Sequence, residues 1–296
     1  MSAGSTEAAP VVEFRRASLS MGRRTLWSGL DLQISPGEYL AVLGGNGTGK
    51  TSLLRVLLGL QPLSGGEVRV QGQAPRRGST GIGYVPQQRA FAREVPMRGR
   101  DLVGMGLDGH RWGPRLRGRA SARRRIDEAL QRVGALDFAD APVGLLSGGE
   151  QQRLRIAQAM ITDPDLLLFD EALLSLDLSR QRDVAGLVAQ QSRRTGAAVV
   201  FVTHDVNPII DDVDRVLYLA NGSFRIGTPD EVLRTDVLSE LYGTPIEVVR
   251  AGGRIIVVGA EREHAHHLDS GPSAHEGAAV RPPHDEGSRP WTTPSR

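Results

Sequence analysis

The chain has 296 residues, of which 40% are hydrophobic, and this is enough for one large domain or two small ones. Its 36 basic and 34 acidic residues nearly balance, which argues against a protein that coats nucleic acid. The absence of cysteine excludes a disulfide scaffold, a thiol nucleophile and a cysteine-ligated zinc or iron–sulfur site. No apolar run approaches the roughly 18 residues of a membrane helix, and residues 1–10 lack a signal-peptide pattern, so we expect a cytoplasmic chain.

The first third of the chain predicts strands around one helix. Residues 11–43 contain short apolar runs typical of strands, with separate strands expected at residues 25–27 and 30–34. Residues 53–60 have apolar side chains at helical spacing, directly after a glycine-rich loop. Residues 65–85 again have the pattern of short strands, separated by glycine and proline turns.

The middle of the chain predicts an inserted helical segment. Residues 89–120 are rich in arginine and glycine, and we interpret them as helices and loops. Residues 121–136 have an amphipathic pattern, which predicts a helix that Ser121 caps. A second helix is expected from Ser147 to about Ile161.

The last third predicts buried parallel strands and two hairpins. Residues 166–169 and 197–202 are short and fully apolar, as strands of a parallel sheet are, and a crossover helix is expected between them. Residues 214–227 predict a hairpin with an Asn-Gly turn, and residues 246–259 predict another.

Residues 260–296 are polar and without periodicity, so we expect a disordered tail. Five of the seven histidines fall in this tail, namely His264, His266, His267, His275 and His284. Neutral imidazoles at short spacing suit zinc or manganese, so one hypothesis is a metal-binding tail. The alternative is a solvated tail in which histidine has no specific role.

A glycine-rich segment after residue 43 predicts a phosphate site. It reads GGNGTGKT, fits the pattern G-x-x-x-x-G-K-[ST], and lies between an apolar strand and an apolar helix. The glycines let backbone N–H groups point into one concavity, where the positive end of the helix adds to them. Lys50 is expected to bridge the β- and γ-phosphates, and Thr51 to offer its hydroxyl to Mg²⁺. The ATP-binding residues expected in this segment are Gly44, Gly45, Asn46, Gly47, Thr48, Gly49, Lys50, Thr51 and Ser52.

Lys50 is also the only lysine, because the other basic residues are all arginine. Coding bias explains a general preference for arginine. A single retained lysine also indicates a position that needs a compact ammonium rather than a planar guanidinium.

Two carboxylates follow the apolar run at residues 166–169. Asp170 and Glu171 would lie at the carboxyl end of a buried parallel strand, and this edge faces the ligand in doubly wound folds. Asp170 is expected to hold Mg²⁺, and Glu171 to orient and deprotonate an attacking water.

The segment LSGGEQQR at residues 146–153 has two interpretations. Ser147 and Glu150 form a capping box, which by itself starts a helix. Two glycines in the first turn, however, weaken a helix by up to about 1 kcal/mol each. Bare backbone N–H groups at a helix N-terminus are typical of an anion site.

Taken in chain order, these motifs make the sequence resemble the nucleotide-binding subunit of an ABC transporter. The motifs are GGNGTGKT, GYVPQQ, LSGGEQQR, LLLFDE, SLD and VTHD, within about residues 11–240. The resemblance implies an α/β P-loop NTPase fold with a RecA-like core, an N-terminal antiparallel β subdomain and an inserted α-helical subdomain. It implies an ATPase domain at 11–259, with the helical subdomain at about 89–160, and a tail at 260–296.

The resemblance also implies roles for single residues, with ATP and Mg²⁺ as the ligands. Gln87 would contact Mg²⁺ and the attacking water, and His204 would contact the γ-phosphate. Asp177 would lie at the interface between two copies. The signature residues expected at the nucleotide of the opposite copy are Ser147, Gly148, Gly149 and Glu150. Since only one motif set is present, a homodimer or a dimer with a close relative is implied.

Three positions depart from the family's pattern. Met21 stands where an aromatic residue usually stacks on adenine, and a thioether packs on a base with weaker stacking geometry. Ala172 replaces a common proline, and Leu174 replaces a usual serine. None of these changes removes a catalytic group, so an active ATPase is expected.

The substrate is inferred from further similarity to the ATPase subunits of bacterial zinc and manganese importers. This similarity lies in residues 170–181, 203–222 and 227–249. It implies an integral membrane permease that docks near Gln87 and residues 90–120, an extracytoplasmic metal-binding protein, and a peripheral position on the cytoplasmic face of the membrane.

Two alternatives are open. The first is an importer of iron–siderophore, haem or cobalamin. The second is a non-transport ABC protein, since the arginine-rich residues 111–125 could bind nucleic acid, although we expect no nucleic-acid partner.

Overall fold

The computed structural model describes residues 9–87, 91–108, 119–174 and 176–259. The predictions for the histidine-rich tail and for much of the arginine-rich stretch therefore lie outside the described residues. None of the helices in the described part of the chain has the length and apolar content that a membrane crossing requires.

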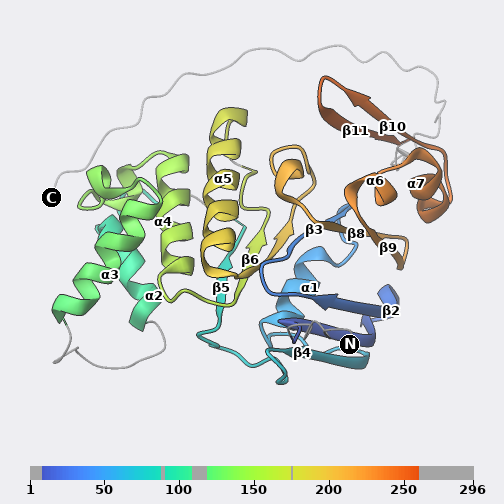
Figure 1. Cartoon of the computed structure of the whole chain (residues 1–296), viewed down its shortest axis with the longest axis horizontal. Helices are drawn as coiled ribbons and strands as arrows, with labels where there is room; N and C mark the ends of the chain where they lie inside the picture. The colour runs from blue at the N-terminus through green and yellow to red at the C-terminus, as the bar shows by residue number, and fades with distance from the viewer. Residues whose placement is uncertain (1–8, 88–90, 109–118, 175, 260–296) are drawn as a thin grey trace, which may run out of the picture. The chain divides into compact units, whose positions relative to one another are not determined.

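A six-stranded sheet forms the centre of the fold (Figure 1). Its strand order is β5-β6-β7-β3-β8-β9, and all pairs are parallel except β8 with β9. The strands are β3 (Tyr39–Gly44), β5 (Ile82–Val85), β6 (Leu166–Asp170), β7 (Ala198–Val202), β8 (Arg215–Ala220) and β9 (Ser223–Gly227). The β8–β9 hairpin has left-handed backbone at Asn221 and Gly222, which confirms the predicted turn.

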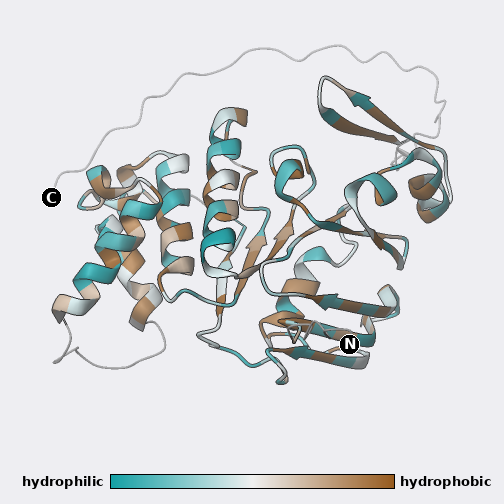
Figure 2. Cartoon of the chain, viewed as in Figure 1, coloured by the Kyte–Doolittle hydropathy of each residue, from teal (hydrophilic) through white to brown (hydrophobic). Residues whose placement is uncertain are grey.

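Both faces of the central strands β6 and β7 are buried, and these strands are apolar apart from Asp170 at the end of β6 (Figure 2). On one face, Phe169 and Phe201 stack with ring centroids 5.0 Å apart, within a core that includes α5 (Leu178–Thr195). On the other face, Leu168 and Val200 pack with α1 (Lys50–Leu57). The predicted parallel strands and their crossover helix are confirmed.

A three-stranded antiparallel sheet, β2-β1-β4, shares the core with α1. It consists of β1 (Val12–Met21), β2 (Arg24–Ile34) and β4 (Gly65–Val70). The prediction of two separate strands at residues 25–27 and 30–34 was wrong, because β2 runs through both. Gly29, with φ 69°, lets one strand continue through the irregularity between the two apolar runs.

The helical segment consists of α2 (Gly99–Asp108), α3 (Arg119–Arg132) and α4 (Gly148–Met160), which pack on one another (Figure 1). The helix predicted at 121–136 is shifted, because Arg119 and Ala120 are good helix formers and precede the predicted cap Ser121. Left-handed backbone at Gly134 stops the chain from continuing as a helix. The predicted start of α4 at Ser147 is confirmed.

The described chain ends with α6 (Pro229–Val232), α7 (Thr235–Tyr242) and the predicted hairpin of β10 (Ile246–Ala251) and β11 (Arg254–Gly259). The Asn207 side chain ties this hairpin to the loop after β7. Its Nδ2 donates to the Ile255 carbonyl at 2.9 Å, and its Oδ1 accepts from the Ile255 N–H at 2.7 Å.

Candidate functional site

The loop between β3 and α1 has backbone that only glycine adopts without strain. Gly44 has φ 140°, and a Cβ atom there would lie 2.2 Å from the Leu219 carbonyl oxygen. Gly49 has φ 101° and precedes α1, and its Cβ would lie 3.0 Å from the indole nitrogen of Trp27. These two glycines therefore hold the loop in its tight curve against the core.

The ammonium of Lys50 lies in the curve of this loop. Its Nζ donates to the carbonyl oxygens of Gly44 and Gly45 at 2.8 and 2.9 Å. The residue is only 6% exposed, and burial lowers the pKa of Lys50, while the carboxylates of Glu171 and Asp170 oppose that shift. A compact ammonium can reach both carbonyls from this position, whereas a guanidinium presents its donors in a fixed planar fork.

Asp170, at the end of β6, connects three elements. Its Oδ1 accepts from Thr51 Oγ1 of α1 at 3.0 Å, and its Oδ2 accepts from the Tyr84 hydroxyl of β5 at 3.4 Å. Burial raises the pKa of Asp170 and raises the pKa of Tyr84 to about 12, the latter with a further contribution from the Asp170 charge. Tyr84 was missed from the sequence, although the segment GYVPQQ contains it.

We expect Asp170→Asn to stabilise the nucleotide-free protein. Because the folded pKa of Asp170 is raised, its ionisation destabilises the folded state, and this penalty appears as the pH rises through the folded pKa. Asparagine removes the charge and keeps an oxygen for Thr51. Calorimetry at about pH 7.5 should show a melting temperature higher by about 2 °C or more. The difference should shrink toward about pH 4, and an equal or lower melting temperature at about pH 7.5 would contradict this account.

Glu171 follows Asp170 with unusual backbone. Its φ is 48°, which is left-handed for a residue that carries a side chain, and its N–H donates to the Val202 carbonyl at 2.9 Å. Gln87 Nε2 donates to Glu171 Oε2 at 2.8 Å. Strained backbone of this kind persists where the surrounding structure holds it, as at functional sites.

A pocket of about 290 Å³ lies over the glycine-rich loop. Met21, 56% exposed, contributes to its wall. The lining residues are Met21, Leu26, Asn46, Gly47, Gly49, Lys50, Thr51, Ser52, Gln87 and Glu171. The structure therefore brings together the glycine-rich loop, Gln87, Glu171 and Met21, the residue expected to pack on adenine.

Other residues expected at the site do not line this pocket. Ser147 and Glu150 form the predicted capping box of α4, with the Glu150 carboxylate accepting from the Ser147 N–H at 2.8 Å. Asp177 caps α5 by accepting from the Arg180 N–H at 3.0 Å. His204 is exposed two residues beyond β7. Among the described residues, no group of three or more histidines and carboxylates could hold a metal ion.

Comparison with known proteins gives the family. The sequence model described as "ABC transporter" matches residues 27–174, which is half of the chain. A zinc import ATP-binding protein of Roseobacter denitrificans is 35% identical over 235 residues, or 79% of this chain and 85% of that protein. The chain belongs to the ABC transporter ATPase family. It is an ATPase, and it is the ATP-binding subunit of an import system.

Other relatives of this ABC transporter ATPase carry different descriptions. An aliphatic sulfonates import ATP-binding protein of Pseudomonas fluorescens is 37% identical, over 71% of this chain and 74% of that protein. A manganese transport system ATP-binding protein of Bacillus subtilis is 30% identical, over 78% of this chain and 92% of that protein.

A solved structure confirms the predicted fold. The inward-facing conformation of a putative metal-chelate type ABC transporter matches with a TM-score of 0.70 and 25% identity. The match covers 84% of this chain and 96% of that chain. The central sheet, the antiparallel sheet and the helical segment thus correspond to the expected RecA-like core with its two subdomains.

Proposed function

We propose that this ABC transporter ATPase drives the import of a divalent metal ion, zinc or manganese, through a partner permease. The observation that carries this proposal is the repeated similarity to metal importers. Zinc import proteins match at 30–35% identity over 75–88% of this chain. The manganese transport relative matches at 30% identity over 78% of this chain.

Hydrolysis is assigned to the groups that line the pocket and its edge. Glu171 would accept a proton from the attacking water, and Gln87, which already donates to Glu171, would orient that water. Lys50 and the backbone N–H groups of the loop would hold the β- and γ-phosphates, and His204 would contact the γ-phosphate. Met21 would pack on the adenine ring.

The oxygens at the end of β6 fit magnesium. Thr51 Oγ1 and Asp170 Oδ1 lie 3.0 Å apart, and hydroxyl and carboxylate oxygens are the ligands that Mg²⁺ prefers. We assign Thr51, Asp170 and Gln87 as the residues that hold the ion, which would neutralise charge on the transferred phosphate. In this arrangement Tyr84 keeps Asp170 turned toward the pocket.

A second copy of the chain completes the site in this proposal. The signature segment at the start of α4 presents backbone N–H groups but lines no part of the pocket of its own chain. A Cβ atom built on Gly148 would meet no other atom within 4 Å, which leaves room for a phosphate on that side. We therefore assign Ser147, Gly148, Gly149 and Glu150 to the nucleotide of the second copy, with Asp177 at the interface between the two.

We assign the docking site of the permease to a cleft in the helical segment. A cavity of about 610 Å³ lies between α2 and α3, with Met105 and Ile126 among its apolar residues and Arg98, Arg100 and Arg123 among its charged ones. An apolar floor with a charged rim suits a short helix of a membrane protein. We also assign the ATPase to a peripheral position on the cytoplasmic face of the membrane and an extracytoplasmic metal-binding protein to the other side, in keeping with the similarity to zinc import proteins.

We expect Met105→Asp to uncouple transport from hydrolysis. Met105 is 50% exposed in the cleft, so aspartate is tolerated in the fold but disrupts an apolar contact with the permease. Metal uptake should fall by about tenfold or more while the ATPase rate of the isolated subunit is kept. Leu60→Asp, equally exposed but outside the cleft, is the matched control. Unchanged uptake in Met105→Asp would show that the permease does not dock in this cleft.

A second substrate class has specific support. The solved neighbour is described as a putative metal-chelate type transporter, which favours a chelated metal such as an iron–siderophore, haem or cobalamin. The sulfonate import relative favours an organic anion. Residues that the ATPase shares with these proteins do not read the substrate, so uptake has to be measured.

The test is uptake of Zn²⁺, Mn²⁺ and Fe³⁺–siderophore by metal-starved cells that carry either the wild-type chain or Lys50→Ala. The proposal predicts that zinc or manganese uptake falls selectively in the variant. Unchanged zinc and manganese uptake, with loss of siderophore or another solute, would overturn the metal assignment and leave the ATPase assignment intact.

A further inference from the structure

The turn between α4 and β6 joins the helical segment to the core sheet. It spans residues 161–165, because α4 ends at Met160 and β6 begins at Leu166. The signature residues lie at the other end of α4, and Asp170 lies at the other end of β6. The geometry of this turn therefore bears on where the two motifs lie relative to each other.

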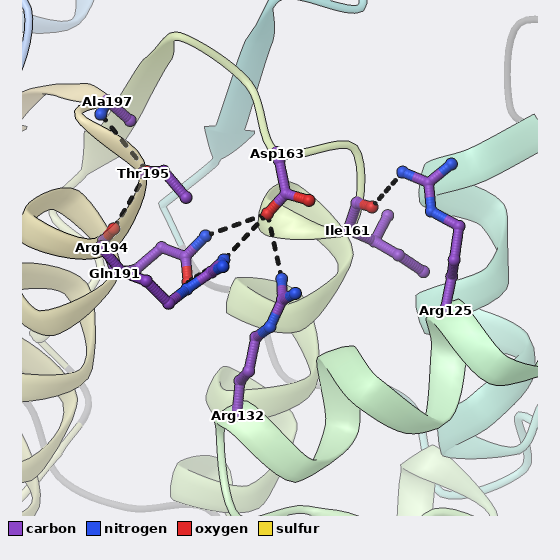
Figure 3. Close-up of polar contacts among 8 residues, drawn as sticks. All are labelled: Arg125, Arg132, Ile161, Asp163, Gln191, Arg194, Thr195 and Ala197. Carbon is purple, nitrogen blue, oxygen red and sulfur yellow. Dashed lines mark hydrogen bonds and ion pairs between the residues drawn. The ribbon is translucent and has the colours of Figure 1, made fainter.

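One carboxylate in this turn binds groups from both sides (Figure 3). Asp163 Oδ1 accepts from Arg132 Nη1 of α3 at 3.0 Å. The same oxygen accepts from Arg194 Nη2 at 3.0 Å and from Gln191 Nε2 at 3.4 Å, both in α5. A single half-exposed ion pair contributes little to stability, but three donors on one oxygen hold two elements together.

The turn itself is held in a strained form. Asp163 has φ 48°, and its N–H donates to the Met160 carbonyl at 2.9 Å. A second arginine of α3 binds the same turn, since Arg125 Nη2 donates to the Ile161 carbonyl at 2.7 Å. Aspartate adopts left-handed backbone at a modest cost, and the contacts of this turn with the arginines of α3 and α5 favour that form.

Apolar packing is incomplete beside these contacts. A cavity of about 280 Å³ lies between α3 and α5, and its lining includes Gln131, Arg132, Gln190 and Arg194. α3 packs chiefly on α2 and α4. Met160 of α4 and Leu187 of α5 also line the cavity, so the polar contacts of Asp163 hold α3 to α5 beside an apolar interface that is not filled.

We infer that Asp163 is a positioning residue for the signature segment. By tying α3 to α5, it sets the angle at which α4 presents Ser147 and Gly148 to the nucleotide of the second copy. The inference rests on the proposed two-copy site. Asp163 contacts no substrate, and its loss leaves the pocket around Lys50 intact but misplaces the signature segment.

Asp163→Gly isolates this effect, because glycine adopts the left-handed backbone without strain. In the purified full chain, kcat for ATP should fall by about tenfold, while the affinity for ADP should stay within about twofold. Asp163→Asn keeps an acceptor oxygen without the charge and should lie between glycine and wild type. The matched control is Asp212→Ala. This variant removes the 2.8 Å contact of Asp212 with Arg193, which lies in α5 like Arg194, and this contact does not involve α3.

Spin labels give a readout that is independent of activity. Because the chain has no cysteine, Arg124→Cys in α3 and Arg182→Cys in α5 give two unique exposed sites. The label-to-label distance distribution should be broader in Asp163→Gly than in wild type or Asp212→Ala. An unchanged distribution with unchanged kcat would overturn the inference. A wild-type chain without ATPase activity would instead contradict the proposed function, while the label distances would still decide the role of Asp163.

Discussion

Glu171→Gln should lower the ATPase rate by about a hundredfold or more and leave ATP binding in place, because the variant loses the proposed base but keeps the shape of the side chain. Glutamine also keeps an oxygen that can accept from Gln87, so the contact seen at 2.8 Å is preserved. Steady-state phosphate release and binding of a fluorescent ATP analogue measure the two quantities. We expect the variant to accumulate ATP-bound dimers.

The control for this variant flanks the same strand, β6. Asp165→Asn removes a carboxylate just before β6, at the opposite end of the strand from Glu171. Its ATPase rate should remain near that of wild type. If Glu171→Gln hydrolysed ATP at the wild-type rate, another group would have to activate the water, and the assignment of Glu171 would be wrong.

Lys50→Ala should weaken ATP binding by about tenfold or more, since it removes a charged donor from the phosphate site. Lys50→Arg should also fail, because the ammonium lies within 3 Å of two carbonyl oxygens in a tightly curved loop, where a planar fork does not fit. Nucleotide titration of the purified chain measures both variants. Arg124→Lys, on the exposed surface of α3, is the conservative control and should bind as wild type does.

The Lys50→Arg result also tests why the chain has a single lysine. Coding bias predicts that arginine would serve at this position as it does at the other 35 basic positions. Wild-type binding by Lys50→Arg would support that explanation and contradict the geometric one.

The sequence predicted the core because its signals are local. The buried strands β6 and β7 are continuous apolar runs, and the glycine-rich loop has its own spacing, so neither depends on distant residues. The predicted start of α3 was wrong, because Arg119 and Ala120 extend the helix and no sharp signal in the sequence marks where it begins. The separate strands predicted within β2 merged, because pairing with β1 continues past Gly29.

The site was predictable only in part for the same reason. Lys50, Thr51 and Asp170 carry motif signals, but Tyr84 reaches Asp170 across 86 residues, and no local pattern marks that contact. The arginine partners of Asp163 likewise lie in α3 and α5, each 31 residues away along the chain. Contacts of this kind depend on the tertiary fold and follow only from the structure.

In the proposed site, hydrolysis needs the pocket of one copy and the signature segment of another. A mixture of two inactive variants tests this requirement. Lys50→Ala disables the pocket, and Gly148→Asp places a carboxylate in open space at the start of α4, where it suits the helix but repels phosphate. Gly148→Ala, which adds a methyl group without charge, controls for the substitution itself.

Each variant alone should be inactive. In an equal mixture that exchanges subunits, half of the dimers combine both variants, and each such dimer has one intact site. We expect recovery of up to about a quarter of the wild-type ATPase rate. No recovery, in mixtures shown to exchange, would contradict it, because each inactive chain would then contain its whole site.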